Sequence, residues 1–258
     1  MATVIVQQFL SADHDPFIFA HRGYSKLFPE NTMLAFRQAL DNGAIAIECD
    51  IQLTRDLEPV IIHDFTLKRT TGKSGKVSQV DWGTVKNLDT GSWFDKSFSS
   101  ETIPHLDDLL AILPPQVLLN LELKSEKKST QKDDLVKIVW EKVQSAGISD
   151  QVLFSSFDTD VVKKLRHKAP KAHVGLLHNS YFGNLPIGLI SEVNPVSIQT
   201  SFRNSCSSFV TKAKQHHLPV FVYTVNSYHE MTSCFEQGVK GIFSDYPSMD
   251  CLIAESQN

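Results

Sequence analysis

The sequence predicts a closed (β/α)8 barrel, in which eight parallel strands form a ring surrounded by helices. Short apolar segments alternate with amphipathic segments along the chain, an order typical of a parallel sheet with helical crossovers. Eight such strands in 258 residues favour a barrel over the alternative, an open doubly wound sheet. The strand candidates are Phe17–Ala20, Ala44–Asp50, Val117–Leu123, Gln151–Ser155, His173–Leu177, Val196–Gln199, Pro219–Val225 and Gly241–Ser244.

Helices are predicted between these strands. The segment Thr32–Asn42 follows a possible N-cap, Asn31, and stops at Gly43. The segment Asp133–Ala146 begins with acidic residues and carries leucine and valine at helical spacing. The other helix candidates are Asp158–Lys168, Asn204–His217, Ser227–Gln237, Ser248–Glu255 and the weaker Leu185–Glu192.

One segment, residues 65–102, interrupts the alternation. It contains four glycines, two tryptophans and no helix of convincing length. It follows Val60–His63, which is expected to pair with Ile51–Leu53 across a turn. Because long irregular segments in compact domains are usually functional, we interpret residues 65–102 as a lid or rim beside a site, with a decorative loop as the alternative. The chain is predicted to be one domain, residues 1–258, with this insertion.

The composition excludes several classes of protein. A net charge of −4 without a clustered basic face argues against nucleic-acid binding. The four cysteines are far apart and indicate neither a disulfide framework nor a zinc site. The N-terminus lacks the features of a signal peptide, and no apolar run reaches the roughly 20 residues that a membrane span needs. We therefore expect a cytoplasmic protein, monomeric or homodimeric, whose partner is a small molecule.

Two acidic residues lie close together on the second predicted strand. Side chains alternate across a strand, so Glu48 and Asp50 share one face while Cys49 points to the other. If that face is the barrel interior, the two carboxylates repel each other and need compensation, for which a hard divalent cation is well suited. The alternative is a solvated pair at an exposed strand end.

The third predicted strand repeats this pattern. Glu122 and Lys124 share a face with Asn120, while leucines occupy the other face. Both strands present these residues near their C-terminal ends, where barrel enzymes carry out their chemistry. Glu122 is therefore a candidate third metal ligand and Lys124 a candidate partner for a phosphate. The alternative is an internal ion pair that only stabilises the barrel.

Two histidines end predicted strand segments near the acidic residues. His21 ends the first strand and precedes Arg22, and His63 ends the segment that follows the turn. Because imidazole titrates near neutral pH, such a pair can act as general base and general acid. The planar guanidinium of Arg22 suits a phosphate oxygen. A structural role for each histidine is the alternative.

With these residues assembled, the sequence resembles the glycerophosphodiester phosphodiesterase family. The resemblance runs in order over about residues 17–250 and is carried by many spaced positions. They are Ala20-His21-Arg22-Gly23, Pro29-Glu30-Asn31-Thr32, Ala35-Phe36, Ala39, Gly43, the run from Ile47 to Thr54, His63-Asp64, Arg69-Thr70-Thr71, Gly91-Ser92-Trp93-Phe94, Ile103-Pro104, the run from Leu121 to Lys124, Thr224-Val225-Asn226 and the run from Gly241 to Pro247.

The resemblance implies a TIM barrel with residues 65–102 as the family's insertion. It implies one divalent cation, Mg²⁺ or Ca²⁺, held by Glu48, Asp50 and Glu122. It gives acid–base roles to His21 and His63. Phosphate binding would fall to Arg22 and Lys124, and Glu30 and Asn31 would have supporting roles. The implied reaction is hydrolysis of glycerophosphodiesters to sn-glycerol 3-phosphate and an alcohol such as choline or ethanolamine.

Three positions depart from the family pattern, and three rival functions remain. Tyr223 stands where the family commonly has Trp, which retains an aromatic substrate contact. Cys49 and Ser244 also differ from the usual residues, but neither replaces an inward-facing charged group. The rivals are a lysophospholipase D-like enzyme, a glycosidase using Glu48 and Glu122 as its carboxylate pair, and a barrel that binds without catalysing.

Overall fold

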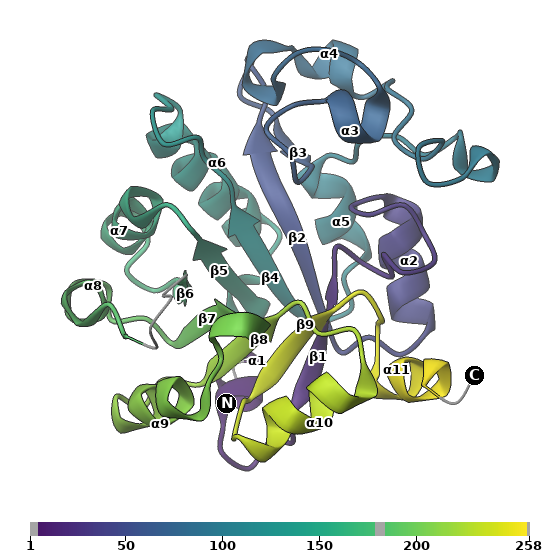
Figure 1. The fold of residues 1–258 in the computed structure, drawn as a ribbon. Helices are drawn as coiled ribbons and strands as arrows, with labels where there is room; N and C mark the ends of the chain where they lie inside the picture. Colours follow the sequence, from purple (N-terminus) through teal and green to yellow (C-terminus); the bar gives the residue numbers. More distant parts are fainter. Residues whose placement is uncertain (1–4, 179–183, 257–258) are drawn as a thin grey trace.

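Eight parallel strands close into a barrel in the computed structural model, which describes residues 5–178 and 184–256 (Figure 1). The ring runs β1–β2–β4–β5–β6–β7–β8–β9 and returns to β1, so the predicted (β/α)8 barrel is confirmed and the open doubly wound sheet is wrong. The strands are β1 (Phe17–His21), β2 (Ala46–Leu53), β4 (Leu118–Leu123), β5 (Val152–Ser156), β6 (His173–Leu177), β7 (Ser197–Ser201), β8 (Val220–Tyr223) and β9 (Gly241–Ser244). The short β3 (Pro59–Ile61) pairs antiparallel with β2, as predicted.

Helices surround the barrel (Figure 1), and α1 packs against the interior of its N-terminal end. They are α1 (Ile5–Leu10), α2 (Met33–Asp41), α5 (Leu106–Ile112), α6 (Lys132–Ser145), α7 (Thr159–Lys168), α8 (Ile187–Val193), α9 (Ser207–Gln215), α10 (Tyr228–Glu236) and α11 (Met249–Glu255). No helix is predicted from the sequence at α1 or α5, which have only six and seven residues and show no clear helical period. Among the described residues, no helix has the length and hydropathy to cross a membrane.

Several predicted helix starts differ from the structure by one to three residues, and α2 and α9 are two examples. The N-cap of α2 is Thr32, whose hydroxyl accepts a hydrogen bond from the Ala35 N–H. The side-chain amide of Asn31 donates instead to Asp50. The helix predicted from Asn204 begins at Ser207 instead, after a short 3₁₀ turn, η4 (Phe202–Asn204). At α2 two adjacent polar residues could cap the helix, and Thr32 does so, whereas the N-cap residue of α9, Cys206, makes no side-chain capping hydrogen bond.

The two faces of β2 are buried in different environments. Ile47, Cys49 and Ile51 pack outward under the helices, as the alternation predicts. The same alternation would place Ile45 with them, but it is 46% exposed because it precedes the start of the strand. Inside the barrel, four phenylalanines and residues of α1 fill the N-terminal end; these are Phe17, Phe19, Phe221 and Phe243 with Val6 and Phe9. This aromatic layer supports a polar layer at the C-terminal end.

The insertion lies beyond the C-terminal ends of β2 and β3 (Figure 1). It contains α3 (Lys68–Thr71), η1 (Val77–Gln79), α4 (Trp82–Val85) and η2 (Lys96–Phe98). A separate apolar cluster ties it to β3, made of Val60, Ile62, Leu67, Val77, Val85 and Ile103. The segment therefore has a packed core of its own at the mouth of the barrel, which favours the rim interpretation over a decorative loop.

The turn after β1 depends on Gly23. Its φ is +82°, and a Cβ there would lie 2.6 Å from the Ala35 carbonyl carbon. We expect Gly23→Ala to destabilise the fold by about 1–3 kcal/mol, because both the backbone conformation and the contact must change. Gly188→Ala on α8 is the matched control, since a Cβ there meets nothing within 4 Å. Equal unfolding midpoints for the two variants would contradict this prediction.

Candidate functional site

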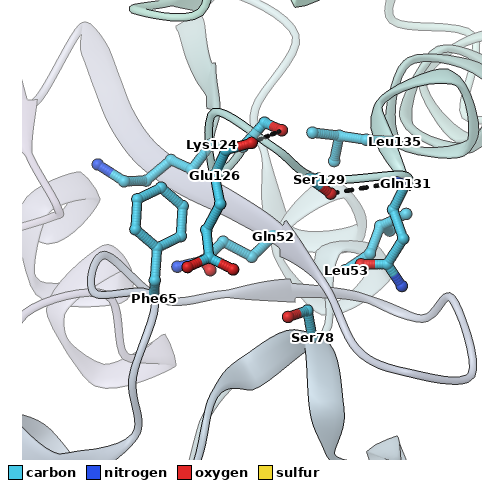
Figure 2. Close-up of a pocket in the computed structure, with 10 residues that line it drawn as sticks. Gln52, Leu53, Phe65, Ser78, Lys124, Glu126, Ser129, Gln131 and Leu135 are labelled. Carbon is cyan, nitrogen blue, oxygen red and sulfur yellow. Dashed lines mark hydrogen bonds between the residues drawn. The ribbon is translucent and has the colours of Figure 1, made fainter.

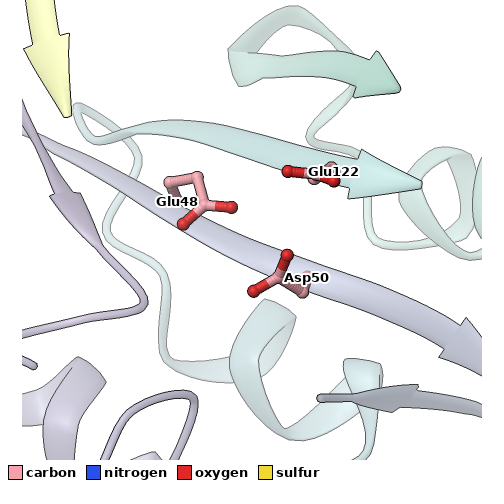
Figure 3. Close-up of side chains that lie close together, drawn as sticks. All are labelled: Glu48, Asp50 and Glu122. Carbon is pink, nitrogen blue, oxygen red and sulfur yellow. The ribbon is translucent and has the colours of Figure 1, made fainter. Parts of the chain in front are cut away.

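Three carboxylates meet at the C-terminal end of the barrel (Figure 3). Glu48 and Asp50 project from β2, and Glu122 projects from β4, where it is the register partner of Asp50. One oxygen of each lies within 4.8 Å of the others, and Glu48 and Asp50 are 3% and 1% exposed. The carboxylates are therefore buried together inside the barrel, and the alternative of a solvated pair at an exposed strand end is wrong.

Asp50 is surrounded by cationic and amide groups. Asn31 Nδ2 donates to Asp50 Oδ2 at 2.9 Å, while Arg22 Nε and Lys124 Nζ lie 3.3 Å from its two oxygens. Burial by itself would raise the pKa of Asp50, but the charges of Lys124 and Arg22 outweigh it and hold the pKa well below its usual range. Asp50 is thus an ionised carboxylate in the interior.

The other two carboxyl groups are less fully compensated. Burial, followed by repulsion from Asp50, raises the pKa of Glu48 well above its usual range and that of Glu122 to about 7. Lys124 lies 3.1 Å from Glu122, so the internal ion pair considered as an alternative does exist. Glu48 Oε2 accepts a hydrogen bond from the Arg22 backbone N–H at 3.0 Å.

This donor set fits a divalent cation. Hard cations prefer carboxylate oxygens, and a dipositive charge would relieve the repulsion that raises the pKa of Glu48 and Glu122. Among the residues that the structure describes, Glu48, Asp50 and Glu122 form the group of His, Cys, Asp and Glu side chains close enough to share one ion. The group contains oxygen donors alone, which favours Mg²⁺ or Ca²⁺ over softer metals.

His21 is oriented by a carboxylate from the other end of the chain. Its Nδ1 lies 2.9 Å from Asp245 Oδ1, and Asp245 also accepts hydrogen bonds from Asn226 at 2.6 Å and from Ser25 at 3.1 Å. No role is predicted from the sequence for Asp245 or Asn226, although both lie in segments that carry the family resemblance. This arrangement leaves the Nε2 edge of the imidazole for a ligand.

His63 has a similar partner, its neighbour Asp64, whose Oδ1 lies 2.7 Å from His63 Nδ1. Burial lowers the pKa of His63, although the nearby Asp50 opposes this shift. Gln52 holds the backbone of this loop, because its Nε2 lies 2.8 to 3.1 Å from the carbonyl oxygens of residues 62–64. Both imidazoles are therefore held at Nδ1 by a carboxylate, an arrangement that fixes ring orientation.

A cavity of about 240 Å³ connects these groups. Both imidazoles, Arg22, Glu48 and Glu122 come from β1 to β4 and the loops that follow them. Phe157, Leu177, Tyr223 and Phe243 come from β5 to β9 and the loops between them, together with the polar Gln199 and Thr224. The rings of Phe157 and Tyr223 meet edge to face, 5.9 Å apart. A charged ester group and an apolar portion of one small molecule could therefore be bound side by side.

A much smaller pocket lies between the insertion and the loop after β4 (Figure 2). Phe65 and Ser78 of the insertion line it together with Glu126, and Lys124 borders it as well. Its volume of about 20 Å³ holds no more than a water molecule. The 240 Å³ cavity, which contains both imidazoles, is therefore the candidate active site. Lys124 borders the small pocket and directs its Nζ to Asp50 and Glu122.

The comparisons with known proteins agree on one family. The profile of the glycerophosphoryl diester phosphodiesterase family matches residues 21–249. A glycerophosphodiester phosphodiesterase from Caldanaerobacter subterraneus is 32% identical over 233 residues, which cover 89% of this chain and 94% of that protein. Another from Bacillus altitudinis is 29% identical, covering 92% of this chain and 98% of that protein.

Solved structures share the fold over nearly the whole chain. A phosphodiesterase from Oleispira antarctica, solved in complex with the product sn-glycerol 3-phosphate, superposes with a TM-score of 0.84 and 28% identity, covering 90% of this chain and 94% of that one. A glycerophosphodiester phosphodiesterase from Agrobacterium tumefaciens gives a TM-score of 0.78 at 25% identity, covering 93% and 99%. The likeness therefore extends over at least nine tenths of this chain.

Proposed function

This chain belongs to the glycerophosphoryl diester phosphodiesterase family, and we propose that it hydrolyses glycerophosphodiesters to sn-glycerol 3-phosphate and an alcohol with one divalent cation. The observation that carries the proposal is the single cavity lined by His21, His63, Arg22, Glu48 and Glu122. Both imidazoles in it are held by aspartates, beside an acidic group suited to a cation. Because the chain belongs to this family of phosphodiester hydrolases, a glycosidase and a non-catalytic binding protein are no longer alternatives.

The cation would be held by Glu48, Asp50 and Glu122, and its identity would be Mg²⁺ or Ca²⁺. When bound, it supplies positive charge that stabilises the developing negative charge on the phosphate oxygens. Arg22 and Lys124, which border the same carboxylates, would bind the phosphodiester. Their donors are already oriented by Asp50, so they lose little freedom when the substrate enters.

The two imidazoles would transfer protons on opposite sides of the phosphorus. Asp245 and Asp64 engage the Nδ1 atoms, so Nε2 would be the reacting nitrogen on both His21 and His63. One histidine removes the proton from the attacking hydroxyl, which belongs to water or to the glycerol itself. The other protonates the departing alkoxide, a poor leaving group without that proton. Attack by the glycerol hydroxyl would release the alcohol and form a cyclic phosphate intermediate, which water would then open to sn-glycerol 3-phosphate.

Tyr223 would contact the carbon skeleton of the substrate on the side of the cavity formed by β5 to β9. Tyr223→Ala is expected to raise KM by about tenfold with a smaller change in kcat, because apolar contact with the substrate is lost in ground state and transition state alike. Tyr223→Trp should retain most of this contact and show a KM near that of the unaltered protein. Steady-state kinetics would measure both, and an unchanged KM in Tyr223→Ala would contradict the assignment.

The proposed activity is tested directly by product release. The purified protein would be given glycerophosphocholine, glycerophosphoethanolamine and glycerophosphoglycerol, with and without Mg²⁺ or Ca²⁺, and sn-glycerol 3-phosphate would be measured. Release that requires an added cation is the expected result. No release from any of these diesters under any condition would refute the proposal.

A lysophospholipase D-like activity is the second candidate, and one observation favours it. Trp93 and Phe94 of the insertion are 39% and 37% exposed, and Leu27 in the loop after β1 is 52% exposed. Exposed apolar side chains at the mouth could contact the acyl chain of a lysolipid. A higher kcat/KM for lysophosphatidylcholine than for glycerophosphocholine would establish this alternative.

Three further properties are proposed from the sequence. The chain would be a single domain, residues 1–258, in which residues 65–102 form the family insertion; its ends, 1–4 and 257–258, lie outside the described residues. It would be cytoplasmic, and it would be a monomer or a homodimer. Size-exclusion chromatography with light scattering would measure the oligomeric state.

A further inference from the structure

Arg69 connects two parts of the active site. It lies on α3 of the insertion and uses its whole guanidinium group on two carboxylates. Nη1 and Nη2 donate to the two oxygens of Glu30, each at 2.7 Å. Nε and Nη2 donate to the two oxygens of Asp64, at 2.8 and 3.0 Å. Such paired donation is specific to arginine, because lysine has no planar fork.

The Glu30 side of this connection leads to Arg22. Glu30 Oε1 accepts from Arg69 Nη2 and also from Arg22 Nη1, the latter at 2.8 Å. Burial would raise the pKa of Glu30, but Arg69 and Arg22 together lower it. If Arg69 were absent, Arg22 would have to neutralise Glu30 alone. Less of its positive charge would then be available to a phosphate in the cavity.

The Asp64 side leads to His63. Asp64 Oδ1 accepts from Arg69 Nη2 and lies 2.7 Å from His63 Nδ1. Hydrogen bonds from Arg69 are the main reason that the pKa of Asp64 falls to about 2. Asp64 therefore stays ionised, and its two contacts with Arg69 restrict its rotation. A freely rotating Asp64 would hold the His63 ring less well.

We propose that Arg69 is a positioning residue that orients Arg22 through Glu30 and His63 through Asp64. The inference rests on the phosphodiester hydrolysis proposed above. It also gives the insertion a role, since residues 65–102 supply the group that joins the loop after β1 to the loop after β3. Arg69 touches none of the groups assigned to the reacting ester, so its effect is transmitted entirely through the two carboxylates.

Other contacts hold Arg69 in place. Its guanidinium lies 5.5 Å from the centre of the Trp93 ring, in a cation–π contact within the insertion. Lys76 of the insertion pairs at 2.7 Å with Glu126, in the loop after β4. The insertion is thus attached both to the loops that carry Glu30 and Asp64 and to the loop after β4. These attachments keep the Arg69 guanidinium close to Glu30 and Asp64.

Arg69→Gln tests this inference by a split in the kinetic constants. We expect kcat to fall by about 10–100-fold through His63 and KM to rise through Arg22. Arg69→Lys should recover only a small part of either loss, because one ammonium cannot bridge four carboxylate oxygens. Arg55→Gln is the matched control. It removes an arginine that pairs with Asp81 of the insertion, and it should leave kcat and KM unchanged.

Chemical rescue separates positioning from folding. Arg69 is 38% exposed, so free guanidinium can reach its place. Guanidinium at low millimolar concentration is expected to raise the kcat of Arg69→Ala several-fold. It should have no effect on the kcat of Arg55→Ala. Unchanged kcat and KM in Arg69→Gln would overturn the inference, as would a loss that guanidinium does not reverse. The unaltered protein is assayed in parallel, so a failure of the proposed reaction itself would be recognised separately.

Discussion

Replacing His63 or His21 with alanine is expected to lower kcat by about 10²–10⁴-fold, because each variant lacks one of the two proton transfers. The fold should persist, since neither imidazole belongs to the apolar core and both are partly exposed. Rates of sn-glycerol 3-phosphate release at saturating substrate would measure the loss. Circular dichroism and the unfolding midpoint would verify that the variants are folded.

The control for this prediction is a histidine far from the cavity. His216 is an exposed residue just after α9, and His216→Ala should leave kcat unchanged. Asp245→Asn and Asp64→Asn should give smaller losses than the histidine variants, because they disturb imidazole orientation but keep the reacting group. Rates near those of the unaltered protein in both His21→Ala and His63→Ala would remove the acid–base assignment.

Removal of divalent cations is expected to abolish turnover, and adding Mg²⁺ or Ca²⁺ back should restore it. Glu48→Gln should reproduce this loss, since an amide is a weaker ligand than a carboxylate and the negative charge at the site is reduced. Titration calorimetry with the metal alone would measure binding without reference to activity. We expect a decrease in affinity of about 10²-fold or more for Glu48→Gln.

Glu48→Gln should weaken metal binding without lowering the thermal stability of the metal-free protein. In the metal-free protein, burial and the charge of Asp50 raise the pKa of Glu48, which means that an ionised Glu48 is unfavourable there. Glutamine has nearly the same shape and can still accept the Arg22 N–H that Glu48 accepts at 3.0 Å. The metal-free variant should therefore unfold at the same temperature or higher. Full activity in chelator, or unchanged metal affinity in Glu48→Gln, would contradict the metal assignment.

The order of strands and helices could be predicted because it depends on local periodicity. The alternation Ile47–Glu48–Cys49–Asp50 placed two carboxylates on the inner face of β2, and the structure places them there. The same reasoning placed Glu122 on the inner face of β4. Elements with little periodicity were missed, namely α1 and α5. Competing polar neighbours produced the error at Asn31, which holds Asp50 instead of capping α2.

The sequence by itself determined the barrel, the inward-facing acids and the histidines at the strand ends, since each follows from side-chain direction within one segment. The tertiary structure decided which distant groups support them. His21 and Asp245 are 224 positions apart, and Arg69 and Glu30 are 39 apart, yet both pairs form hydrogen bonds. Only closure of the barrel and docking of the insertion bring such residues together, because no local pattern specifies contacts across the ring.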